Sequence, residues 1–82
     1  MRAYYYKPKA EENLANLNAC DDIDQINNAV KALAAGKKNG YMVPLQSPYL
    51  NKNQILYQYA VGRYKLNYTL TEKELNVESV MV

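Results

Sequence analysis

The sequence contains no histidine, no tryptophan and no phenylalanine, and it has a single cysteine among its 82 residues. Histidine is the commonest general base and the commonest metal ligand in proteins. Its absence therefore argues against most enzyme mechanisms and most metal sites. We expect a protein that is not an enzyme, with no catalytic residue, no metal and no cofactor.

The lone Cys20 cannot form an internal disulfide, which is typical of proteins from a reducing compartment. No apolar run approaches the roughly 20 residues that a membrane-spanning helix needs. The opening stretch MRAYYYKPK lacks the apolar core of a signal peptide. We therefore expect a cytoplasmic protein with no membrane contact. A chain of 82 residues predicts a single compact α+β domain over residues 1–82.

The charged residues are segregated along the chain, although the net charge is only +2. Residues 11–30 carry five acidic and no basic side chains, whereas residues 31–70 carry six basic and no acidic ones. The basic segment also holds six of the nine tyrosines. This division predicts two electrostatic faces on the folded protein.

A strand and then a helix are predicted on the two sides of Pro8. Residues 2–7, RAYYYK, indicate a short strand because tyrosine favours strands. Alternation places Tyr4 and Tyr6 on one face and Tyr5 on the other. Pro8 ends that strand and suits the first turn of a helix. The apolar positions that share one face of this helix are Ala10, Leu14 and Leu17.

A second helix is predicted over DDIDQINNAVKALAAG, residues 21–36. Asp21 or Asp22 can cap its start, and Gly36 suits the position just beyond its end. The residues that recur at the helical period are Ile23, Ile26, Val30, Leu33 and Ala34.

A β-hairpin is predicted over residues 54–71, because two alternating runs are separated only by Gly62 and Arg63. Glycine at the first position of a two-residue loop is typical of a type II′ turn. The hairpin register places one apolar and aromatic face toward the core, so we expect its tyrosines to be buried or at the core rim, with water at their hydroxyls. The predicted pairs are Val61–Tyr64, Tyr59–Leu66, Tyr57–Tyr68 and Ile55–Leu70.

The remaining segments are less regular. The stretch YMVPL, residues 41–45, predicts a strand at a sheet edge or a strand end, because Pro44 cannot donate to a central ladder. Residues 71–74, TEKE, match a capping box and predict one helical turn. Residues 77–82 are compatible with a final strand or a frayed tail. The expected order is β-α-α-β-β-β, an α+β fold in which two helices pack on one face of a small antiparallel sheet.

Candidate binding residues are four cations of the basic segment, residues 31–70, and the tyrosines of this segment that lie outside the hairpin. Tyr5 is a further tyrosine that we expect to be exposed. A helix-turn-helix reading is rejected, because aspartates at the start of the second helix would repel phosphate. Whether the cations converge in space is left open at this stage. The candidates are Lys37, Lys38, Tyr41, Tyr49, Arg63 and Lys65.

The first functional hypothesis is that the protein is a small non-enzymatic protein-interaction module. We expect a stoichiometric inhibitor or regulator of a larger host complex, of the anti-defence type, encoded by a phage or other mobile element. The alternative hypothesis is a nucleic-acid-binding protein that uses residues 31–70. The partner is in either case a macromolecule, and pairing through the exposed edge of residues 2–7 leaves a homodimer open.

Overall fold

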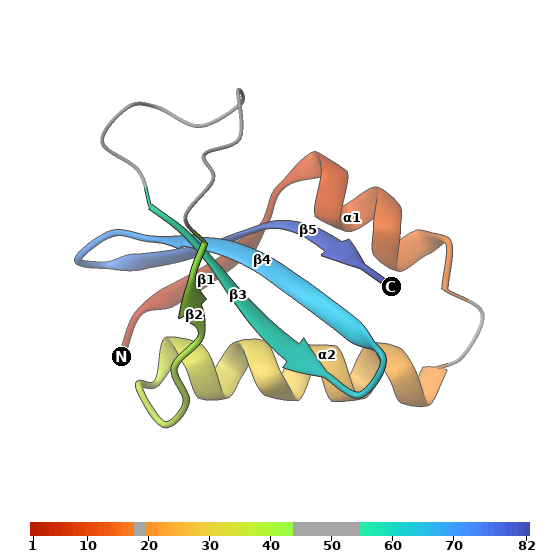
Figure 1. The fold of residues 1–82 in the computed structure, drawn as a ribbon, viewed down its shortest axis with the longest axis horizontal. Helices are drawn as coiled ribbons and strands as arrows, with labels where there is room; N and C mark the ends of the chain where they lie inside the picture. Colours follow the sequence, from red (N-terminus) through yellow and green to blue (C-terminus); the bar gives the residue numbers. More distant parts are fainter. Residues whose placement is uncertain (18–19, 44–54) are drawn as a thin grey trace.

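The computed structural model describes residues 1–17, 20–43 and 55–82. Within these ranges the chain forms two helices and a five-stranded mixed sheet (Figure 1). The elements are β1 (Ala3–Tyr6), α1 (Pro8–Ala15), α2 (Cys20–Ala34), β2 (Tyr41–Met42), β3 (Leu56–Val61), β4 (Tyr64–Leu70) and β5 (Glu74–Met81).

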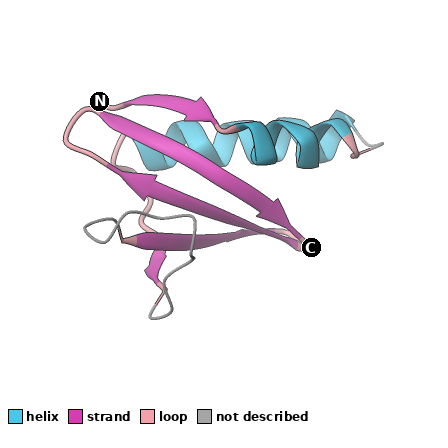
Figure 2. Cartoon of the chain, turned by 90° about the horizontal axis from the view of Figure 1, so that it is seen from above, coloured by secondary structure: helices cyan, strands magenta, loops and turns pink. Residues whose placement is uncertain are grey.

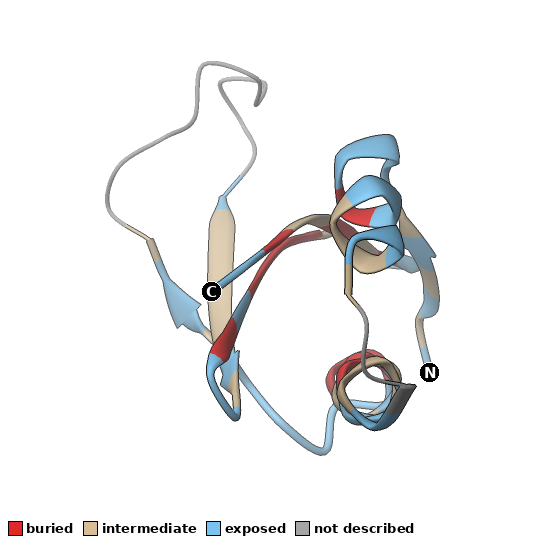
Figure 3. Cartoon of the chain, turned by 90° about the vertical axis from the view of Figure 1, so that its right-hand side faces the viewer, coloured by how far each residue is buried: buried red, intermediate tan, exposed pale blue. Residues whose placement is uncertain are grey.

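The strand order across the sheet is β1-β5-β4-β3-β2. β1 pairs in parallel with β5, and the other neighbours are antiparallel. Both helices lie on the same side of the curved sheet (Figure 3), whereas β2 and β3 lie farther from them (Figure 2). The predicted α+β class is therefore confirmed. The sheet is mixed, however, because β1 joins it beside the last strand of the chain.

The core lies between the helices and the sheet face that they cover. Fully buried apolar side chains meet there from α1, α2, β4 and β5; they are Ala10, Ile26, Val30, Leu66, Leu75 and Val77. Burial of each large side chain stabilises the fold by about 1.5–3 kcal/mol. Neither described helix is long and apolar enough to cross a membrane.

The structure confirms most of the predicted hairpin register. Val61, Tyr59 and Tyr57 pair with Tyr64, Leu66 and Tyr68, in that order. Gly62 has φ of +57°, and no residue other than glycine has a positive φ among the described residues. A positive φ at the first turn position alone matches the predicted type II′ turn.

The predicted pair Ile55–Leu70 is wrong. The ladder between β3 and β4 ends at Leu56 and Thr69. Ile55 lies outside the strand and is 44% exposed. Leu70 pairs with Leu75 of β5, on the other side of β4. Its position in the sheet therefore depends on the following strand.

The predicted helical turn at residues 71–74 is also wrong, because this segment is the tight turn from β4 to β5. The Thr71 hydroxyl accepts the backbone N–H of Glu74 at 3.0 Å, and the Thr71 N–H donates to the Glu74 carbonyl at 2.8 Å. The Thr-x-x-Glu pattern thus satisfies the same N–H group that it would satisfy at a helix start, but in a hairpin.

Residues 77–81 belong to the strand β5, and the register of this strand explains why alternation alone was ambiguous. Asn67 pairs with Ser79, but the next residue, Tyr68, pairs with Val77. Glu78 is therefore an extra residue, a β-bulge. The bulge lets Val77 and Val80 both reach the core although three positions separate them.

The start of α2 also differs from the prediction. The helix begins at Cys20, so Asp21 and Asp22 lie in its first turn and do not cap it. Carboxylates in a first turn are stabilised by the helix dipole. The predicted end is correct: Gly36 has φ of +77°, and the N–H groups of Gly36 and Lys37 donate back into the last turn of the helix.

Candidate functional site

The tyrosine rings of the hairpin pack mainly against the core of the fold. Tyr64 and Tyr68 are buried, and Tyr57 and Tyr59 are half-buried against the same core. The rings of Tyr57 and Tyr68 stack with centroids 5.5 Å apart and an interplanar angle of 19°. These rings are consequently not an open stacking surface.

Two hydroxyls of the hairpin tyrosines bind protein groups, which corrects the expectation that water would satisfy them. The Tyr64 hydroxyl donates to a carboxylate oxygen of Asp22 at 2.7 Å. The Tyr68 hydroxyl accepts the backbone N–H of Gly40 at 2.8 Å. Each bond ties the hairpin to a segment at one end of α2.

The start of α2 forms a closed electrostatic cluster with the hairpin turn. Arg63 approaches Asp22 at 3.5 Å, donates to the Tyr64 hydroxyl at 3.0 Å and lies over the Tyr64 ring, 5.2 Å from its centroid. The hydrogen bond to Tyr64 is the main reason that the pKa of Arg63 is raised. The charge of this arginine is therefore engaged within the fold.

The other end of α2 gathers cations from three distant parts of the chain. The Arg2 N–H donates to the Ala34 carbonyl at 3.0 Å, and Arg2 Nε donates to the Thr71 carbonyl at 2.8 Å. These bonds join the chain start, the end of α2 and the β4–β5 turn, all at the left of Figure 1. We call the resulting set of exposed or half-buried cations the basic end; it comprises Arg2, Lys37, Lys38 and Lys73.

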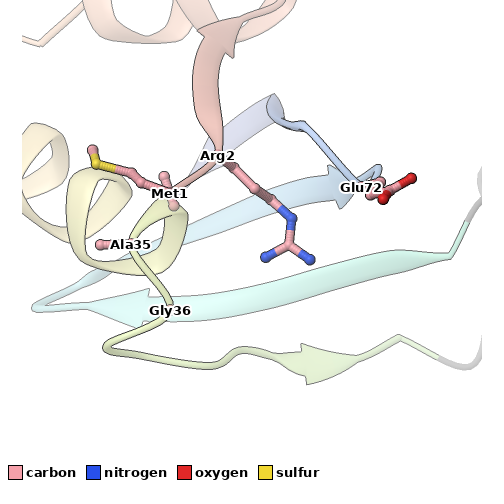
Figure 4. Close-up of a pocket in the computed structure, with 6 residues that line it drawn as sticks. Met1, Arg2, Ala35, Gly36 and Glu72 are labelled. Carbon is pink, nitrogen blue, oxygen red and sulfur yellow. The ribbon is translucent and has the colours of Figure 1, made fainter.

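A shallow depression of about 310 Å³ lies at the basic end. Figure 4 shows the Arg2 side chain extending beside it, with the Glu72 carboxylate turned away from the guanidinium. Among the described residues, the ion pair found joins Arg63 to Asp22. The basic end therefore retains its positive charge. The depression is lined by Met1, Arg2, Ala34, Ala35, Gly36 and Glu72.

The predicted site residues do not converge into one patch. Arg63 contacts the start of α2, whereas Lys37 and Lys38 follow its end, and a helix of 15 residues is about 22 Å long. Lys65 lies on β4 near the hairpin turn. Tyr49 lies outside the described residues. The four candidate cations are thus divided between the two ends of α2.

Tyr41 and Tyr5 are exposed, as predicted, with 81% and 51% of their surface accessible. Tyr41 lies on the edge strand β2, three residues after Lys38.

Sequence reasoning missed Arg2 and Lys73 as parts of the basic end. Charge counts could not find them, because the parallel pairing of β1 with β5 brings the two segments together.

The sheet face opposite the helices carries polar side chains that satisfy one another. Gln58 donates to the Asn67 side chain at 3.1 Å, and Asn67 donates to the Ser79 hydroxyl at 3.0 Å. The Thr69 hydroxyl donates to Glu78 at 3.1 Å. Asn67 and Thr69 are buried although they lie on the face opposite the core. The centre of this face therefore offers few polar groups to a ligand.

No protein-family model matches the chain, and no curated protein matches it significantly. Within the described ranges, no three histidine, cysteine, aspartate or glutamate side chains lie close enough to hold a metal ion.

Proposed function

We propose that this protein is a small non-enzymatic interaction module that acts in the cytosol and binds an acidic surface of a partner protein through its basic end. The observation that carries the proposal is the charge at the two ends of α2. Arg63 forms an ion pair with Asp22 at one end, whereas Arg2, Lys37 and Lys73 have no carboxylate within ion-pair distance among the described residues at the other. Unpaired charge of one sign steers an oppositely charged partner and sets the orientation of docking.

Exposed apolar side chains beside the lysines support a protein partner. Tyr41 and Met42 form β2 and are 81% and 61% exposed. They follow Lys37 and Lys38 closely in the chain. Tyrosine and methionine are enriched in the cores of protein interfaces, and charged residues are common at the rims. Binding without chemistry suits a stoichiometric inhibitor or regulator, the role that we propose.

One observation favours the alternative, a nucleic-acid-binding protein. Tyr41 is open to stacking and lies beside two lysines, and a base stacked on an aromatic ring contributes about 1–3 kcal/mol. The hairpin rings, however, are packed into the core, and the central polar side chains of the open sheet face are paired with each other. One exposed ring is a weaker platform than a series of rings, so we rank this function second.

The test is fluorescence anisotropy with a labelled glutamate-rich peptide and a labelled single-stranded oligonucleotide of equal charge. We expect the peptide to bind more tightly than the oligonucleotide. Lys37→Glu, Lys38→Glu and Lys73→Glu combined should weaken peptide binding by at least about tenfold, because steering and rim contacts reverse their sign. The melting temperature should change little, since all three side chains are exposed.

The matched control makes the same charge change away from the basic end. Its three positions are exposed as well; they are Lys7, Lys9 and Lys65. This variant should keep most of the peptide binding. Equal losses in the two variants would show that net charge alone drives binding. Tighter binding of the oligonucleotide at physiological salt would favour the alternative function.

A further inference from the structure

We propose that Arg2 is the anchoring residue of the basic end and that its guanidinium binds a side-chain carboxylate of the partner. The inference rests on the proposed function and names the group that is recognised. Arg2 lines the depression, and its Nε is already used by the Thr71 carbonyl. Among the described residues, the two terminal amino groups of the guanidinium have no hydrogen-bond or ion-pair partner, so they can bind a ligand.

The position of Arg2 is fixed before any partner arrives. Its own N–H donates to the Ala34 carbonyl at 3.0 Å, and the N–H of the next residue, Ala3, donates to the Lys73 carbonyl at 3.0 Å. The bond from Nε to Thr71 further restrains the side chain. A guanidinium that is held in place loses little conformational entropy when it binds a ligand.

The end of a helix ordinarily disfavours an anion, because its last carbonyl groups form a negative pole. Here those carbonyls are occupied. Ala34 accepts the Arg2 N–H, Leu33 accepts the Gly36 N–H at 3.2 Å, and Ala32 accepts the Lys37 N–H at 2.9 Å. The lysine side chains that follow add positive charge. The depression is therefore suited to an anion in spite of its place at a helix C-terminus.

The geometry of the guanidinium and its accessibility suit a carboxylate on a protein surface. Guanidinium and carboxylate groups are both planar and form paired, charge-assisted hydrogen bonds. Gly36 lines the depression, and a Cβ built on it would have nothing within 4 Å, so this wall of the site is open. Glu72, which also lines the site, points away from Arg2 in Figure 4 and leaves the guanidinium accessible.

The first experiment tests the carboxylate site without a partner. The isotope-labelled protein is titrated with sodium acetate and, separately, with sodium chloride at equal ionic strength. We expect the NMR signal of Arg2 Nε–H to move in acetate and not in chloride. Arg63 is the internal control, because its guanidinium already contacts Asp22 and should not respond. The inference is overturned if Arg2 responds equally to both salts, or if inorganic phosphate moves its signal and acetate does not.

The second experiment uses the glutamate-rich peptide and two variants that keep the charge. Arg2→Lys should weaken binding by about tenfold, because lysine lacks the planar fork. Lys73→Arg should leave the affinity within about twofold of wild type. Equal affinity of Arg2→Lys and wild type would overturn the role of Arg2 and leave the proposed function standing. If acetate moves Arg2 but the peptide does not bind, the carboxylate site stands and the proposed function fails.

Discussion

The two ends of helix α2 use arginine in different ways. At the start of the helix, the largely exposed Arg63 side chain contacts Asp22 at 3.5 Å and lies over the Tyr64 ring, so a carboxylate lies beside its charge. At the end, the backbone N–H of Arg2 donates to the Ala34 carbonyl and its guanidinium Nε donates to the Thr71 carbonyl, and no carboxylate lies within ion-pair distance among the described residues. Carbonyl oxygens position a guanidinium but do not neutralise it.

This difference indicates which cations are available for binding. A surface arginine that already holds a carboxylate must lose that contact before it can bind another anion. An arginine held only by backbone carbonyls keeps its full charge and a fixed orientation. A count of charges in the sequence treats Arg2 and Arg63 alike, whereas their contacts assign them to different roles.

The largest expected effect is at the glycine that precedes β2, beside the basic end. A Cβ on Gly40 would clash with the Tyr68 hydroxyl and with the carbonyl oxygen of Gln58, 2.7 Å away. Gly40→Ala should therefore lower the free energy of unfolding by about 1–3 kcal/mol in a urea melt.

Gly36 gives a matched contrast to Gly40, because it is needed for its positive φ and not for lack of space. Gly36→Ala should cost about 1 kcal/mol, and Gly36→Asn should cost less, because asparagine tolerates this conformation. At Gly40 the order should reverse, with asparagine worse than alanine. The same order at both glycines would contradict the two different causes.

A smaller effect is expected at the start of α2. Tyr64→Phe removes the hydroxyl that donates to Asp22 and accepts from Arg63. We expect a loss of about 1 kcal/mol in the free energy of unfolding, because both hydrogen bonds are lost but water can solvate the exposed Arg63 and the partly exposed Asp22 in their place. Tyr59→Phe is the control, because Tyr59 is half-buried on the same hairpin face and its hydroxyl has no hydrogen bond to the part of the chain that the structure describes. Equal stability of the two variants would show that the cluster adds nothing to folding.

The smallest effect is expected from the ionisation of Tyr6 beside the middle of α2, and it appears only at alkaline pH. The Tyr6 hydroxyl donates to Asn27, and burial raises the pKa of Tyr6 to about 12. In the unfolded chain the pKa is about 10. Between about pH 10 and pH 12 the unfolded state releases this proton first, so stability should fall as the pH rises through this window.

Tyr6→Phe isolates this contribution, because phenylalanine has no proton to release. Urea melts across the alkaline range should show a shallower decline for Tyr6→Phe than for wild type. A residual decline is expected, since burial also raises the pKa of Tyr68. Identical slopes would mean that Tyr6 titrates in the folded protein as it does in the unfolded chain.

Only part of the candidate site could be predicted from the sequence. Lys37, Lys38 and Tyr41 were predicted because they lie in one short segment that follows a helix. Arg2 and Lys73 are 71 positions apart in the chain and become neighbours only when β1 pairs with β5. The sequence left open whether Arg63 lies beside these lysines, and the structure places it at the opposite end of α2, next to Asp22.

The sequence by itself determined the local features of this protein: the periodicity of α2, the glycine at its end, the alternation of Tyr4, Tyr5 and Tyr6, and the hairpin at Gly62. Each depends on residues within a few positions of one another. The tertiary structure alone decided the parallel pairing of β1 with β5, the bulge at Glu78 and the carboxylate that neutralises Arg63. These contacts join residues far apart in the chain, and the entropy that such closure costs is recovered only by packing of the whole core. These long-range contacts therefore cannot be predicted from any short stretch of sequence.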